Sequence, residues 1–141
     1  MNARGILDTS VVIALGEVDP ASLPNLCLIS AITLAELSAG PLVAKDSTEQ
    51  AARQARLQQA EQDFDPLPFD ASCARAFGEV SAGIRASGRT IRARAYDALI
   101  AATAIAHGVP LYTLNPEDFA HIKRIDVRVP AMTNPLVSTP S

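Results

Sequence analysis

The sequence contains few aromatic residues: it has no tryptophan, and only 4% of its 141 residues are aromatic. Because 48% of the chain is nevertheless hydrophobic, its core has to be built from Ala, Val, Ile and Leu. Such a composition is common in parallel sheets that are covered by helices. A chain of this length is also sufficient for one domain with one sizeable core. We therefore expect a single α/β domain.

The sequence also has fewer basic than acidic residues, 12 Lys and Arg against 15 Asp and Glu. The formal net charge is -3, so the chain as a whole lacks the positive surface that drives non-specific binding to nucleic acids. Any contact with a nucleic acid must therefore come from a local group of basic side chains.

Cysteines and long apolar segments are also scarce. Cys27 and Cys73 lie in apolar surroundings without CxxC spacing, which predicts buried thiols in a reducing compartment rather than a disulfide or a zinc site. The sequence contains no uninterrupted run of apolar residues long enough to span a bilayer. We expect a soluble, cytoplasmic protein that does not contact a membrane.

Short apolar segments alternate with helix-forming segments along the chain. Strands are predicted at residues 4–8, 26–30, 109–114 and 125–129, and residues 65–70 can hold only a short or edge strand. Helices are predicted at residues 10–16, 31–39, 46–63, 70–86 and 94–107, followed by a helical turn from Pro116. This alternation predicts a mainly parallel central sheet of about four to five strands flanked by helices.

The last residues differ in composition from the rest of the chain. The domain is expected to span residues 1–130, whereas residues 131–141 are rich in Pro, Ser and Thr. We expect these last residues to form a flexible tail.

Several acids occur where a parallel sheet collects functional groups. Asp8 ends the first strand, Glu36 lies in the second main helix, and Asp97 lies in the first turn of a very apolar helix. Taken singly, each has an ordinary interpretation as a helix cap, a solvent-facing side chain or a partner of the helix dipole. If their elements form one sheet, the acids meet at one edge and need a cation to neutralise them. Oxygen ligands without clustered His or Cys favour Mg²⁺, or Mn²⁺ in its place, over zinc.

Four segments of the chain, in order, are ILDTS (residues 6–10), ISAITLAEL (29–37), YDALIAATA (96–104) and LYTLNPEDF (111–119). They resemble the signature blocks of PIN domains, most closely those of VapC-type toxins, over about residues 4 to 129. The resemblance implies a single PIN-like domain and a metal-dependent endoribonuclease that is the toxin of a type II toxin–antitoxin system. Hydrolysis of RNA by a metal-activated water would leave a 5′-phosphate and a 3′-hydroxyl.

By position, the resemblance also assigns site residues. Asp8, Glu36 and Asp97 match the acidic metal ligands of the family. Asn115 stands where many relatives carry an acid, so either Asn115 or Asp118 completes the metal site, and Asp118 also joins the catalytic acids.

Substrate contacts are expected from hydroxyl and basic side chains. Thr9 and Thr113 match hydroxyl positions that line the family's site, although both can equally satisfy backbone groups. Arg89, Arg92 and Arg94 come just before Asp97 and are candidates for binding RNA, although the same residues are typical of a solvated loop. Lys123 and Arg124 form a weaker second patch.

The resemblance further implies a cognate VapB-type antitoxin and a homodimer. The apolar residues Leu34, Leu37 and Leu42 fit such contacts, but they fit a hydrophobic core equally well.

Two other functions stay open at this point. A phosphohydrolase of the haloacid-dehalogenase type also begins with a strand that ends in aspartate, but it requires a second aspartate where this chain has Ser10. A catalytically weak binding module with a PIN fold is the other alternative. The three acids argue against it, and Asn115 leaves room for it.

Overall fold

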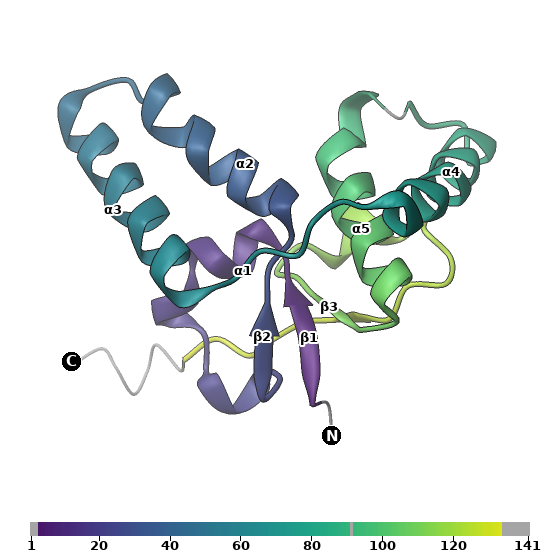
Figure 1. Ribbon diagram of the computed structural model, residues 1–141, viewed down its shortest axis with the longest axis horizontal. Helices are drawn as coiled ribbons and strands as arrows, with labels where there is room; N and C mark the ends of the chain where they lie inside the picture. Colours follow the sequence, from purple (N-terminus) through teal and green to yellow (C-terminus); the bar gives the residue numbers. More distant parts are fainter. Residues whose placement is uncertain (1–2, 91, 134–141) are drawn as a thin grey trace.

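A sheet of four parallel strands forms the centre of the molecule in the computed structural model, which describes residues 3–90 and 92–133 (Figure 1). The strands are β1 (Arg4–Leu7), β2 (Leu26–Leu28), β3 (Leu111–Tyr112) and β4 (Val127–Arg128), in the order β2-β1-β3-β4. All three neighbouring pairs are parallel. The predicted parallel α/β sheet is therefore confirmed, and its number of strands is within the predicted range.

Helices fill the segments between the strands. They are α1 (Thr9–Ile13), α2 (Ala31–Ala39), α3 (Ser47–Asp63), α4 (Ala71–Ala86) and α5 (Ala95–His107). Short 3₁₀ turns are η1 (Leu15–Glu17), η2 (Pro20–Ser22), η3 (Gly40–Val43), η4 (Arg92–Arg94) and η5 (Pro116–Phe119). Helix α3 packs on α2, and α4 packs on α5, so that two helix pairs lie on either side of the strands (Figure 1). None of the helices in the described ranges is long and apolar enough to cross a membrane.

Successive residues of a strand point to opposite faces of the sheet. In β1 and β3, residues on both faces are buried. Ile6 and Leu111 pack into a core that includes residues of α4 and α5, such as Ile84. Their neighbours Leu7 and Tyr112 pack into a second core with residues of α1, α2 and α3. The sheet thus joins two cores in one domain.

The third strand is shorter than the predicted segment 109–114. At its start, the Val109 amide donates to the Ala104 carbonyl at 3.2 Å, which closes the end of α5. At its end, the Asn115 amide donates to the Thr113 hydroxyl at 3.0 Å, so the chain turns away from the sheet. Local hydrogen bonds at both ends therefore limit the strand. Residues 65–70 contribute only an isolated parallel bridge between Leu67 and Ser30.

The chain returns to the first loop after β4. The Asp19 amide donates to the Ala131 carbonyl at 2.7 Å, and the Thr133 amide donates to the Glu17 carbonyl at 2.8 Å. Most of the expected tail, residues 134–141, lies outside the described residues, and the boundary at residue 130 stays a prediction. Cys27 and Cys73 are free thiols, of which Cys73 is buried and Cys27 is partly buried.

Candidate active site

Asp8 lies at the carboxyl end of β1, where it is the N-cap of α1. Its side chain is only 5% exposed. The Thr9 amide donates to Oδ1 at 2.8 Å, and Oδ2 accepts hydrogen bonds from Ser10 Oγ at 2.9 Å and Thr113 Oγ1 at 2.7 Å. Three donors from two segments therefore fix this carboxylate at the edge of the sheet. The role of Asp8 as a helix cap is compatible with its predicted role as a metal ligand, because a capping carboxylate can keep a lone pair free for a cation.

Glu36 of α2 is joined to the start of α1 through Thr9. The Thr9 hydroxyl donates to Glu36 Oε1 at 2.6 Å. Thr9 Oγ1 also lies 3.0 Å from the hydroxyl oxygen of the buried Thr33. Because the Thr9 proton is given to Glu36, Thr33 must be the donor in that pair. Burial raises the pKa of Glu36, the Thr9 hydrogen bond opposes this shift, and the charge of Asp8 adds to it.

Asp97 lies in the first turn of α5. Its pKa is raised to about 6, first by burial and then by the negative charges of Asp8, Asp118 and Glu36. The positive charge of Arg94 acts in the opposite direction. Four acids that are far apart in the sequence therefore share one electrostatic environment.

Asp118 follows β3 in the turn η5, and it is paired with a base. Arg94 Nη1 donates to Asp118 Oδ1 at 2.6 Å, and the same nitrogen lies 3.9 Å from Asp97 Oδ2. Asn115, which precedes this turn, is exposed. The structure thus brings the Asp118 carboxylate toward Asp97 through Arg94.

These side chains fit a hard divalent cation by the chemistry of their donors. All the candidate ligands are oxygen atoms. Burial raises the pKa of Asp97 first, and the charges of three neighbouring carboxylates, which a cation would neutralise, raise it further. Within residues 3–90 and 92–133, however, no group of three or more His, Cys, Asp or Glu side chains is already arranged to hold a metal ion. Protein donors occupy the carboxylates instead: Thr9 binds Glu36, and Arg94 binds Asp118. A metal ion would therefore have to replace these hydrogen bonds in order to bind the Glu36 and Asp118 oxygens.

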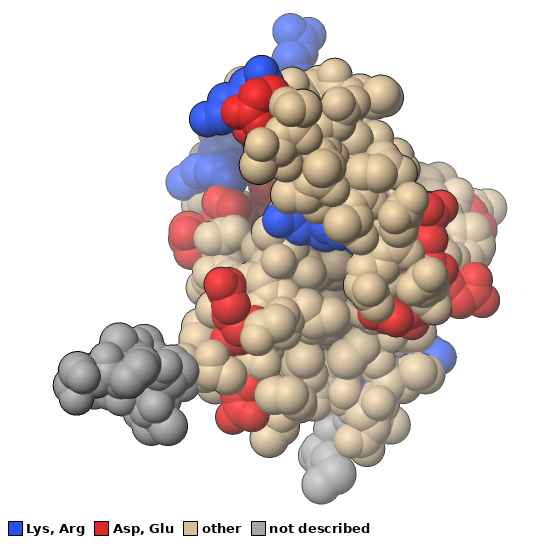
Figure 2. All heavy atoms as spheres, turned by 90° about the vertical axis from the view of Figure 1, so that its left-hand side faces the viewer, with Lys and Arg blue, Asp and Glu red and all other residues tan. Residues whose placement is uncertain are grey.

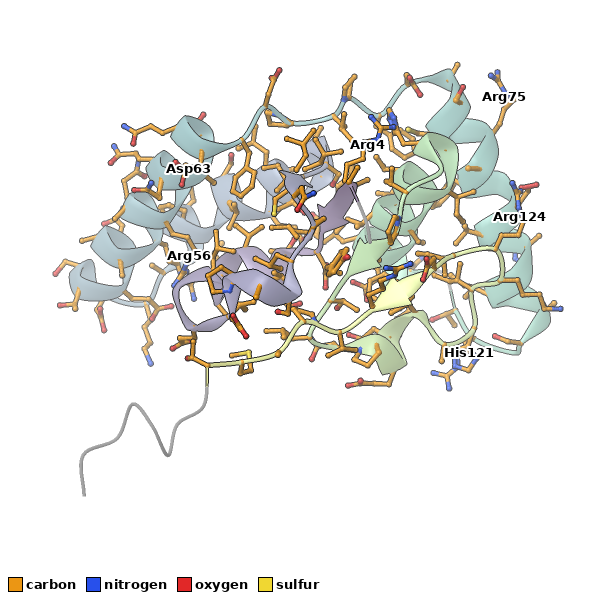
Figure 3. All side chains as sticks on the ribbon, turned by 90° about the horizontal axis from the view of Figure 1, so that it is seen from below. Arg4, Arg56, Asp63, Arg75, His121 and Arg124 are labelled. Atoms are coloured by element: carbon orange, nitrogen blue, oxygen red, sulfur yellow. The ribbon has the colours of Figure 1, made fainter. Side chains whose placement is uncertain are left out.

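The predicted basic residues differ in how close they lie to the acids. Arg92 and Arg94 line a cavity of about 510 Å³ together with Glu36 and Asp97. Arg89 lines a neighbouring cavity. Arg124 of the weaker second patch pairs with Glu79 of α4, and Figure 3 shows it beside that helix.

Two hydroxyl residues of this site were not assigned a role from the sequence. Thr33 lies three residues before Glu36 and therefore shares its helix face, a spacing that could have identified it. Ser10 donates to Asp8 and accepts from the Leu114 amide at 3.1 Å, which links α1 to the end of β3. No sequence pattern pointed to that link, because it joins residues more than a hundred positions apart.

The parallel sheet, with Asp8 at the carboxyl end of β1 and further acids on α2, α5 and η5, defines the class of protein. The chain belongs to the PIN domain family, whose model matches residues 6–125. This membership removes the haloacid-dehalogenase alternative.

Within that family, the similar proteins are VapC ribonucleases. The chain is 37% identical to ribonuclease VapC5 of Mycobacterium tuberculosis over 121 residues, which is 84% of this chain and 87% of the relative. It is 34% identical to ribonuclease VapC4 of the same organism over 127 residues, 88% of this chain and 95% of the relative. The crystal structure of VapBC-5, a member of the VapBC family of toxin–antitoxin systems from M. tuberculosis, contains a similar chain. The two chains superpose with a TM-score of 0.77 and are 34% identical, and the match covers 92% of this chain and 98% of that chain. The resemblance to VapC-type PIN domains is thus confirmed.

Proposed function

We propose that this protein is a Mg²⁺-dependent endoribonuclease and the toxin of a VapBC-type pair. It hydrolyses RNA phosphodiesters and leaves a 5′-phosphate and a 3′-hydroxyl. The observation that carries the proposal is the meeting of acids from four separate segments at one sheet edge, where Asp8, Glu36 and Asp118 all raise the pKa of Asp97. Similarity to proteins named VapC ribonucleases supports the choice of RNA as substrate.

In this mechanism, Asp8 and Asp97 would hold the metal ion and Glu36 would orient a water molecule. When bound, Mg²⁺ lowers the pKa of a water molecule and neutralises the charge that develops on the phosphate. The water oxygen would form a bond to phosphorus as the bond to the 3′ oxygen breaks; the water would lose a proton to solvent and the 3′ oxygen would take one up, so that one water molecule is consumed in each cleavage. Thr113 keeps the Asp8 carboxylate in place through its 2.7 Å hydrogen bond. Either Asp118 or Asn115 completes the site, and Mn²⁺ can replace Mg²⁺.

As the toxin of such a pair, the protein would bind a VapB-type antitoxin, form a homodimer and act in the cytoplasm. Solved structures of similar chains carry the names of VapBC toxin–antitoxin systems. The apolar surface available for a partner is smaller than the sequence suggested, because Leu37 is 6% exposed and belongs to the core. Leu42 on η3 is 83% exposed, and it is the better candidate for such a contact.

The test is cleavage of RNA by the purified protein with Mg²⁺ or Mn²⁺, with the new ends mapped by ligation that requires a 5′-phosphate. Asp8→Asn and Asp97→Asn should abolish cleavage while circular dichroism shows an unchanged fold. Glu79→Gln is the matched control, because Glu79 is an exposed acid paired with Arg124 outside the site. Cleavage by the two asparagine variants at the wild-type rate would refute the assignment. RNA that stays intact with the wild-type protein as well as with every variant would favour the alternative function, a catalytically weak binding module.

A second experiment tests the role as a toxin. Expression of the chain should arrest growth, and co-expression of the adjacent upstream gene should relieve the arrest. Unaltered growth with intact cellular RNA would count against this role.

A further inference from the structure

Three arginines gather beside the acidic site without a partner of opposite charge. Arg85 lies at the end of α4, and Arg89 and Arg92 lie in the segment that leads to α5. Together with Thr90 they line a cavity of about 430 Å³. All three are exposed, and none pairs with a carboxylate of the described residues, whereas Arg53, Arg94, Arg124 and Arg128 do. Unpaired guanidinium groups around a hollow are suited to a phosphate.

This cavity adjoins the acidic site. Arg92 lines both the arginine cavity and the cavity of about 510 Å³ that contains Glu36 and Asp97. Arg94 belongs only to the second cavity, and its guanidinium is engaged by Asp118. A polyanion bound by Arg85, Arg89 and Arg92 would therefore reach from the arginine cavity into the adjoining cavity that contains the acids.

An exposed aromatic ring stands at this junction. Tyr96 directly precedes Asp97, lines the same cavity as Arg92, and is 55% exposed. The other aromatic residues in the described part of the chain are buried or partly buried. An exposed aromatic ring beside a cavity lined by arginines offers a surface on which a nucleobase can stack.

We infer that the two cavities form one binding track for unpaired RNA, in which Arg85, Arg89 and Arg92 bind a phosphate and Tyr96 stacks on an adjacent base. The inference rests on the proposed function, and it deepens it by naming the residues that position the substrate. A duplex keeps its base faces stacked on one another, so only an unpaired nucleotide can use the Tyr96 ring.

The distribution of charge on the side formed by α2 and α3 fits this location. Figure 2 shows the side of the molecule on which α2 and α3 lie, where acidic and basic side chains are dispersed over a mostly uncharged face. RNA would therefore be attracted locally, as the net charge of -3 requires.

The phosphate contacts are tested by fluorescence anisotropy with a short fluorescein-labelled single-stranded RNA of mixed sequence. EDTA is present so that RNA binds without cleavage. Arg85→Gln and Arg89→Gln should each weaken binding severalfold and lower the salt slope by about 0.7, the value for one lost phosphate contact to a single strand. Arg75→Gln is the matched control, because Arg75 lies on the same helix α4 at its other end and projects outward (Figure 3). Equal affinities for all three variants, or no binding of this RNA by the wild-type chain, would overturn the track.

The stacking contact is tested with RNAs that carry 2-aminopurine at successive positions. The wild-type protein should quench the fluorescence at one position, Tyr96→Phe should retain the quenching, and Tyr96→Ala should lose it and bind about tenfold more weakly. The same RNA in a duplex should lose most of its affinity. Quenching that persists in Tyr96→Ala, or a duplex that binds equally well, would contradict the inference. RNA that binds as described but stays intact with Mg²⁺ or Mn²⁺ would instead refute the nuclease and leave the track in place.

Discussion

The Arg94 guanidinium and the Asp118 carboxylate form an ion pair of 2.6 Å inside the acidic site. The same Arg94 nitrogen is 3.9 Å from Asp97. A positive charge supplied by the chain itself thus offsets part of the repulsion between carboxylates from η5 and α5. Any metal ion that enters this site has to compete with that charge.

Replacement of Arg94 with glutamine should therefore strengthen metal binding. The change removes a cation that repels Mn²⁺, and it releases Asp118 to act as a ligand. We expect a severalfold lower dissociation constant for Mn²⁺ in the metal-free protein, measured by calorimetric titration. Arg75→Gln, which removes the same charge outside the site, should leave this constant unchanged. Weaker Mn²⁺ binding by Arg94→Gln would show that Arg94 supports the site rather than competing for it.

The stability of the metal-free protein should depend on pH through Asp97. Its pKa is about 6 in the folded protein, compared with about 3.9 in an unfolded chain. Between these values the folded protein holds more protons, so the contribution of Asp97 to stability is present at low pH and is lost as the pH rises toward 6. Asp97→Asn removes the charge, so it should raise the free energy of unfolding at neutral pH in EDTA, measured by urea denaturation.

The exposed Asp65→Asn provides the control for this experiment, and we expect it to change stability little at any pH. An Asp97→Asn protein that is less stable than wild type at neutral pH would contradict the electrostatic explanation. In saturating Mn²⁺ the order should reverse, because the ion binds the wild-type site more tightly and binding stabilises the folded state.

Much of the fold could be predicted because its signals are local. The helices α2, α3, α4 and α5 have bounds within one residue of the predicted ones, since their caps and apolar patterns are short-range features. The strands were predicted too long, because the hydrogen bonds that limit β3 involve Ala104 and the Thr113 hydroxyl. Such competition between local and ladder bonds is not visible in an apolar run.

The candidate site likewise has a part that could be predicted from the sequence and a part that could not. Asp8, Glu36 and Asp97 could be assigned because their positions match family blocks, and the structure joins all three electrostatically. The pairing of Arg94 with Asp118 could not be foreseen, since it depends on how η5 lies against the start of α5. The sequence grouped Arg94 with Arg89 and Arg92 as candidates for binding RNA, but Arg94 differs from them because it forms an ion pair with Asp118.

Thr113→Val should impair both stability and cleavage. Thr113 is buried, donates to Asp8 Oδ2 at 2.7 Å and accepts from the Asn115 amide at 3.0 Å. Valine has the same shape without the hydroxyl, so the change leaves the Asn115 amide without its acceptor and Asp8 Oδ2 with Ser10 as its remaining donor; it should cost about 1–3 kcal/mol. Thr113→Ser keeps the hydroxyl and should restore the rate of RNA cleavage. A valine variant that matches the serine variant in both unfolding and cleavage would show that the hydroxyl does not hold Asp8.

Gly108→Ala should reduce stability without changing the active site. Gly108 ends α5 in the left-handed region with φ of 64°, and a Cβ at this position would meet no atom within 4 Å. The cost is therefore backbone strain alone, about 1 kcal/mol. Gly16 is the matched control, because its Cβ position is equally open and its φ lies outside that region. Gly16→Ala should leave the unfolding midpoint unchanged or raise it. Because Asp97 lies at the opposite end of α5, RNA cleavage by Gly108→Ala should equal that of wild type below its unfolding temperature; equal midpoints for the two alanine variants would contradict the assignment of strain to Gly108.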